Sequence, residues 1–169
     1  MADRDETALK PTLRPMLPAD APALAAIFGA SVDELTADDY DEDQRAAWMA
    51  TAEDEVAFGA RLGAMLTLVA VVEGAPAGFA ALKDNARVDM LFVDPALARR
   101  GIGTLLVDAL EKLAKARGAK ALTVDAPDAA RPFFERRRYA AQSRQSVPVN
   151  GEWLASTRLE LKVEGPPAA

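Results

Sequence analysis

The segment Arg99-Arg100-Gly101-Ile102-Gly103-Thr104 joins an apolar run typical of a strand, residues 88–93, to an amphipathic helix. The two glycines of this junction let the backbone approach a ligand closely. The first amide groups of the helix have no partner within the helix, and they carry the positive end of its dipole. The junction therefore predicts a site for a phosphate or pyrophosphate group.

The helix that follows is indicated by apolar residues at the spacing of one helical face, and Gly118 marks its end. These residues are Ile102, Leu105, Leu106, Ala109, Leu110 and Leu113. A Gly-x-Gly pair also occurs in turns where glycine serves only the backbone, so a purely structural loop is the alternative.

The loop lacks the marks of two common phosphate-binding motifs. The dinucleotide fingerprint requires a third glycine, and a Walker loop requires a Gly-Lys-Ser/Thr ending. Residues 98–103, Ala-Arg-Arg-Gly-Ile-Gly, instead resemble the acyl-CoA loop of the GNAT (general control-related N-acetyltransferase) acyltransferase superfamily. That pattern is Gln/Arg-x-x-Gly-x-Gly/Ala, and Ala98 departs from its first position.

Two neighbouring segments extend the resemblance. Leu91-Phe92-Val93-Asp94-Pro95 has the form of the family's strand before the loop. Residues 125–139, which include Arg-Pro-Phe-Phe-Glu-Arg at 131–136, resemble the next helix in a small bacterial branch of the family. The usual glycine is replaced by Arg138, so we expect an unusual turn there. The resemblance runs from about residue 13 to residue 163 and is specific over residues 88–139.

Periodicity and resemblance predict the same α/β fold, a mixed and mostly antiparallel sheet with one parallel, splayed pair of strands, flanked by about four helices. Strands are expected at residues 13–16, 65–72, 77–82, 88–93, 121–124, 139–147 and 153–161, the last two joined by an Asn-Gly turn. Helices are expected from Pro18 to about residue 32 and at residues 43–51, with a further turn up to Arg61. We predict one domain, residues 11–163, with flexible ends at residues 1–10 and 164–169.

Composition excludes several kinds of chemistry. The chain has no cysteine and no histidine, so a disulfide, a thiolate nucleophile, a Ser-His-Asp triad and a Cys/His zinc site are excluded, and we expect no metal. The net charge of −6 disfavours nucleic acid as a partner. No apolar run suits a membrane span and the charged start does not resemble a signal peptide, so we expect a cytoplasmic location.

The resemblance implies which residues hold acyl-CoA. Main-chain groups of Leu91, Phe92 and Val93 would pair with the pantetheine arm, and one N–H would polarise the thioester carbonyl. The pyrophosphate would meet the loop amides, the Thr104 hydroxyl and the two arginines, with a solvated loop as the alternative for the arginines. The loop residues are Arg99, Arg100, Gly101, Ile102, Gly103 and Thr104. Phe133 and Phe134 would line the cleft.

Asp89 is the preferred general base, because it interrupts an apolar strand beside the expected thioester position. The alternative is an ion pair with Arg87 or a hydrogen bond on the sheet face. Phe134 stands where many relatives have a tyrosine acid, which makes Tyr139 the nearest candidate. The family has an aromatic core residue at that position, so the alternative for Tyr139 is a purely structural role in the core. It is also left open that the thiolate departs without a general acid.

Tyr40 and Trp48 fall where this fold usually builds the wall of the acceptor site. Ten acidic residues between Asp33 and Glu55 favour a cationic acceptor, with a solvated acidic face as the alternative. Trp153 is expected near the same pocket or in the core.

The sequence thus predicts an acyl-CoA-dependent N-acyltransferase, using acetyl-CoA and acetylating a primary amine of a small molecule or a protein in a ternary complex. A covalent acyl-enzyme is not expected without cysteine. The main alternative is a GNAT-fold acyl-CoA sensor or partner-binding module without catalysis. A nucleotide-binding protein of another fold is a weaker alternative, and a homodimer is left open.

Overall fold

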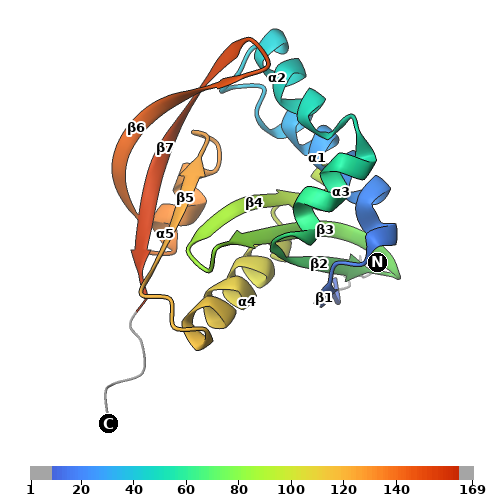
Figure 1. The fold of residues 1–169 in the computed structure, drawn as a ribbon, viewed down its shortest axis with the longest axis vertical. Coiled ribbons are helices and arrows are strands. Elements are labelled where there is room, and N and C mark those ends of the chain that lie inside the picture. Colours follow the sequence, from blue (N-terminus) through green and yellow to red (C-terminus); the bar gives the residue numbers. More distant parts are fainter. Residues whose placement is uncertain (1–8, 164–169) are drawn as a thin grey trace, which may run out of the picture.

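A computed structural model describes residues 9–163 of the chain. Seven strands form one sheet in the order β1-β2-β3-β4-β5-β7-β6 (Figure 1). The strands are β1 (Thr12–Pro15), β2 (Leu66–Val72), β3 (Ala75–Lys83), β4 (Arg87–Val93), β5 (Ala121–Ala126), β6 (Ala140–Val149) and β7 (Glu152–Lys162). All neighbouring strands are antiparallel except β4 and β5.

Helices cover both faces of the sheet (Figure 1). The α-helices are α1 (Ala21–Leu35), α2 (Glu42–Met49), α3 (Glu55–Gly63), α4 (Ile102–Ala116) and α5 (Arg131–Arg136). Short 3-10 turns are η1 (Pro18–Asp20), η2 (Ala50–Ala52) and η3 (Pro95–Leu97). One apolar core joins α4 and α5 to the sheet, and a second core joins α1 and α3 to the opposite face of β2, β3 and β4.

The parallel pair β4–β5 is short. Its register consists of Arg87 with Thr123 and Val88 with Val124, although β4 continues to Val93 and β5 to Ala126. Opposite this break, β3 and β4 contain a bulge in which Ala81 pairs with Met90 and Leu82 with Val88, so that Asp89 is the extra residue. Because a bulge bends its strand, β4 turns away from β5 beyond Asp89.

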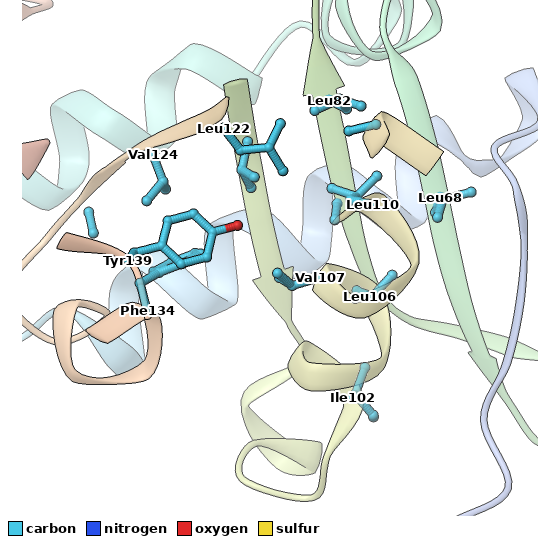
Figure 2. Packing of buried hydrophobic residues seen from close by; sticks show 14 of the residues in the cluster. Leu68, Leu82, Ile102, Leu106, Val107, Leu110, Leu122, Val124, Phe134 and Tyr139 are labelled. Atoms are coloured by element: carbon cyan, nitrogen blue, oxygen red, sulfur yellow. The ribbon is translucent and has the colours of Figure 1, made fainter. Parts of the chain in front are cut away.

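Helix α4 packs across the sheet through one apolar face, as its sequence pattern predicts. Ile102, Leu106, Val107 and Leu110 are each at most 1% exposed, and Figure 2 shows them facing Leu68, Leu82 and Leu122 of the strands. Gly78 of β3 allows this close approach. A Cβ atom at Gly78 would lie 3.0 Å from the Phe92 carbonyl oxygen and 3.2 Å from Ile102 Cγ2, so the N-terminus of α4 sits directly over β3 and β4.

The predicted mixed sheet, its parallel pair and the Asn-Gly hairpin are confirmed. Arg138 adopts φ +72°, which confirms the unusual turn expected where relatives have glycine. The turn predicted up to Arg61 is a separate helix, α3, because the Asp54 side chain caps it by accepting from Ala57 N–H. Apart from residues 9 and 10, the predicted flexible ends lie outside the described residues.

Candidate active site

The edge of β4 that faces β5 is open beyond Val88. Leu91, Phe92 and Val93 pair with Ala80, Phe79 and Gly78 of β3 on their other side. In the described part of the chain, no residue of β5 is in register with these three. Their backbone groups on that edge are therefore free to pair with an extended ligand.

The loop that follows β4 in the chain leaves the first backbone amides of α4 without partners. Arg99 and Gly101 adopt φ +61° and +86°, and the first α-helical hydrogen bond runs from Leu105 N–H to the Gly101 carbonyl. The amides of Ile102, Gly103 and Thr104 therefore have no partner within the helix. The first turn of α4 holds no acidic residue, and Arg99, Arg100 and Thr104 are exposed. This arrangement suits a diphosphate.

The two phenylalanines of α5 differ in position. A Cβ atom at Gly103 would lie 3.9 Å from the Phe133 ring, so Phe133 stands beside the loop, and its predicted role in lining the cleft stays a prediction. Phe134 is 2% exposed and packs against Phe133 and Tyr139. A lining role for Phe134 does not fit this burial, because its apolar ring lies inside the core.

Asp89 lies at the vertex of the splay, between two arginines. Its carboxylate oxygens are 3.7 Å from Arg61 of α3 and 3.5 Å from Arg87 of β4. The side chain is 12% exposed. The ion pair with Arg87, named above as the alternative to catalysis, is thus present, and it leaves the carboxylate next to the open edge of β4.

A second carboxylate continues this series of charges. Arg87 also contacts Asp125 of β5 at 3.1 Å, and Arg158 of β7 donates two hydrogen bonds to Asp125 at 2.8 and 3.1 Å. Burial alone would raise the pKa of Asp125, but the hydrogen bonds and charges of Arg158 and Arg87 outweigh it and lower the pKa below the ordinary value. Asp125 is therefore ionised at neutral pH.

Tyr139 lies in the core beneath α4. Figure 2 shows its ring beside Phe134 and Val124, it is 2% exposed, and its hydroxyl donates to Glu111 at 2.9 Å. Burial and the neighbouring Glu111 carboxylate raise the pKa of Tyr139. Glu111 also binds Arg137. These contacts favour packing over a role as the acid.

Tyr40 and Trp48 belong to an aromatic cluster that covers β4 on the face opposite α4. Trp48 makes edge contacts with Tyr40, Phe28 and Phe92 at centroid distances of 5.7 to 5.9 Å. The Tyr40 hydroxyl donates to the Ala155 carbonyl of β7 at 2.6 Å. Burial, with Asp39 and Asp128 nearby, raises the pKa of Tyr40 to about 12. Tyr40 is thus buried and held in place by its hydrogen bond, whereas Trp48 is half-buried and is the more accessible of the two rings.

Comparisons with known proteins agree with this geometry. The profile of the acetyltransferase (GNAT) domain family matches residues 36–161. The chain belongs to the GNAT acetyltransferases. It is 33% identical over 150 residues to the uncharacterised N-acetyltransferase YafP of Escherichia coli, covering 89% of this chain and 95% of YafP.

Solved structures of GNAT proteins share the fold. A GCN5-related N-acetyltransferase from Rhodopseudomonas palustris is 55% identical with a TM-score of 0.88, covering 90% of this chain and 95% of the other. The PaiA N-acetyltransferase of Thermoplasma acidophilum, solved in complex with coenzyme A, is 17% identical with a TM-score of 0.72, covering 91% and 99%. The second likeness supports the fold alone.

Several charged residues that lie near Asp89 in the structure were missed by sequence reasoning. Arg61, Lys83, Asp125 and Arg158 come from four different elements. Polar alternation in β5 and β7 marks Asp125 and Arg158 as facing away from α4, but the pairing of β5 with β7 that joins them was not predicted. Within residues 9–163, no three metal-ligating side chains come together, and no helix has the length and apolarity to cross a membrane.

Proposed function

We propose that this GNAT protein transfers an acetyl group from acetyl-CoA to a primary amine of a small molecule or a protein, by direct attack in a ternary complex. The observation that carries the proposal is the open edge of β4 running into the glycine loop of α4. Together they match an extended thioester arm with a diphosphate at its end.

The chain offers three kinds of contact to this donor. The amides of Ile102, Gly103 and Thr104, with the Thr104 hydroxyl, would hold the diphosphate, and Arg99 and Arg100 would add charge-assisted hydrogen bonds. The backbone of Leu91, Phe92 and Val93 would pair with the amide groups of the arm. An N–H on this edge would polarise the thioester carbonyl. Phe133 would cover the loop from the side of α5.

In the transfer step the amine nitrogen attacks the thioester carbonyl carbon, the new C–N bond forms and the C–S bond breaks. Asp89 accepts the proton that the amine loses, directly or through a water molecule. The departing thiolate takes its proton from solvent, because Phe134 has no hydroxyl to supply one. Trp48 forms the wall against which the acceptor packs, and the buried Tyr40 supports it from behind. The alternative is that Tyr139 acts as the general acid, but its buried contacts favour a structural role.

A second candidate function is a catalytically impaired sensor of acyl-CoA. Phe134 in place of the usual tyrosine and Ala98 at the first loop position favour it. The two functions differ in one observable. A sensor binds acetyl-CoA and releases no CoA with any amine, whereas a transferase releases CoA in proportion to acetylated product. A cytoplasmic location, the lack of a nucleic-acid partner and a homodimer stay predictions.

Thermal unfolding with and without acetyl-CoA tests the donor site, with ATP and NAD as controls. At a hundred times its dissociation constant a ligand adds about 2.7 kcal/mol to stability, which is about 5–10 °C for a chain of this size. We expect this shift with acetyl-CoA alone. No shift at millimolar acetyl-CoA would contradict the proposal.

A further inference from the structure

An open depression of about 360 Å³ lies on the face of the sheet opposite α4. It is lined by Arg61, Ala64, Met65, Lys83, Asp84 and Asp89. Asp89, the proposed base, is therefore part of a pocket wall that also contains two cations, Arg61 and Lys83, and a second carboxylate, the exposed Asp84. An acceptor that reaches Asp89 from this side meets those cations.

The cations continue beyond the pocket in a series of alternating charges. Arg61, Asp89, Arg87, Asp125 and Arg158 are connected by ion-pair contacts between 2.8 and 3.7 Å. The series thus holds three guanidinium groups and two carboxylates. Its members come from α3, β4, β5 and β7, so the charges surround the vertex where β4 and β5 separate.

Exposure is distributed unequally along this series. The carboxylate side chains of Asp89 and Asp125 are 12% and 16% exposed, whereas the arginine side chains are 42% to 50% exposed. A molecule arriving at this series therefore meets mainly N–H donors of guanidinium groups, and the exposed carboxylate of Asp84 lies on the same pocket wall. Such donors bind carboxylate and phosphate oxygens with paired, directional hydrogen bonds.

The distance to the proposed thioester position fits a small molecule. Leu91 lies two residues after Asp89, which corresponds to about 7 Å of strand. Arg61 itself lies 3.7 Å from the Asp89 carboxylate, so an anionic group at Arg61 and an amine that faces Asp89 can belong to one compact acceptor. The acidic residues near Tyr40 do not oppose this, because the amine end of such an acceptor is itself cationic before it loses its proton.

We propose that the acceptor carries an anionic group, carboxylate or phosphate-like, next to its amine, and that Arg61 and Lys83 bind that group while Asp89 faces the amine. The proposal rests on the proposed acetyl transfer and narrows its substrate class to amphoteric amines such as amino acids. A purely cationic amine lacks the group that the guanidinium donors require.

The test compares matched acceptors with acetyl-CoA as donor. Each acceptor is supplied in three forms that differ only in one group, which is a carboxylate, a carboxamide or a phosphonate. Phenylalanine and its two analogues are one such set. Further sets vary the side chain and the number of carbon atoms between the amine and that group. Released CoA is measured with a thiol reagent, which has no background because the chain has no cysteine. We expect kcat/KM at least tenfold higher for an anionic member than for its carboxamide, equivalent to about 1.4 kcal/mol. The carboxylate and phosphonate arms identify which anion is preferred.

Variants of the pocket residue Arg61 test whether the pocket causes the preference for anionic acceptors. Arg61→Gln should reduce the acid-to-amide ratio of kcat/KM toward one through KM, and Arg61→Lys should restore part of it. Arg136→Gln, which removes an exposed arginine of α5 on the other face of the sheet, is the matched control and should leave the ratio unchanged.

The outcomes separate the two proposals. CoA release with equal efficiency for acids and amides would overturn the substrate class and leave acetyl transfer standing. If no amine releases CoA, the proposed acetyl transfer is wrong. Calorimetry then measures the affinity of the acid and of the amide form of each acceptor for the CoA-saturated protein, and this decides whether the pocket prefers an anion. Equal affinity for acid and amide would then overturn the inference as well.

Discussion

The donor side and the acceptor side of this site are built in different ways. The donor side consists of backbone, namely the open edge of β4 and the amides of the loop from Arg99 to Thr104, and all of it lies within one stretch of sequence. The proposed acceptor side consists of side chains that α3, β3, β4, β5 and β7 bring together, with Trp48 of α2 beside them. A backbone site depends on few side-chain identities, whereas a side-chain site can change its ligand by substitution. The proposed acceptor side is therefore the part of the site that substitutions can change most readily.

Gly103→Glu should break the donor side most severely. Its carboxylate would enter the position of the diphosphate, and like charges at a binding site cost several kcal/mol, so we expect acetyl-CoA affinity to fall about a thousandfold or more. Gly103→Ala is the matched control, because a Cβ atom there makes an ordinary 3.9 Å contact with Phe133. Calorimetry measures both variants, and thermal scans verify that they fold. Unchanged affinity in folded Gly103→Glu would remove the loop from the donor site.

Asp89→Asn should break the acceptor side while leaving the donor side intact. We expect kcat to fall about a hundredfold, the lower end of the range for general-base catalysis, because water can still take the proton. The dissociation constant of acetyl-CoA should not change. Glu34→Gln, an exposed change on α1, controls for loss of one negative charge. Full activity of Asp89→Asn over the whole pH range would show that Asp89 serves only its ion pairs.

Asp125→Asn examines what holds the acceptor side together. The side chain accepts two hydrogen bonds from Arg158 and contacts Arg87, so its loss should cost about 1–3 kcal/mol of unfolding free energy at neutral pH. Its pKa is lowered in the folded protein, so this stability is present above the unfolded value of about 3.9 and is lost as pH falls through the folded value. Urea unfolding at several pH values measures the difference between wild type and variant. A difference that stays constant down to pH 3 would contradict the role of its charge.

The same contrast explains what could be predicted from the sequence. The loop, the strand before it and α4 are adjacent in the chain, and local periodicity and glycine placement predict these elements, whereas the donor roles of their residues came from the family resemblance and stay predictions. Arg158 meets Asp125 only because β7 inserts between β5 and β6, and no local pattern indicates that order. Trp153, expected near the pocket or in the core, is 62% exposed, since it lies at the start of β7 on the open side of the hairpin.

Tyr139→Phe should have the smallest effect, and it decides between two interpretations of one hydroxyl. In the folded protein this hydroxyl donates to Glu111, which also binds Arg137, so its removal should cost about 1 kcal/mol and lower Tm by about 2–4 °C. Because the pKa of Tyr139 is raised and its ring is 2% exposed, the proton is held away from the acceptor pocket and kcat should stay within about twofold. A large loss of kcat at unchanged Tm would instead identify Tyr139 as the acid that protonates the departing thiolate, and the role lost at Phe134 would then have moved to a residue five positions later in the chain.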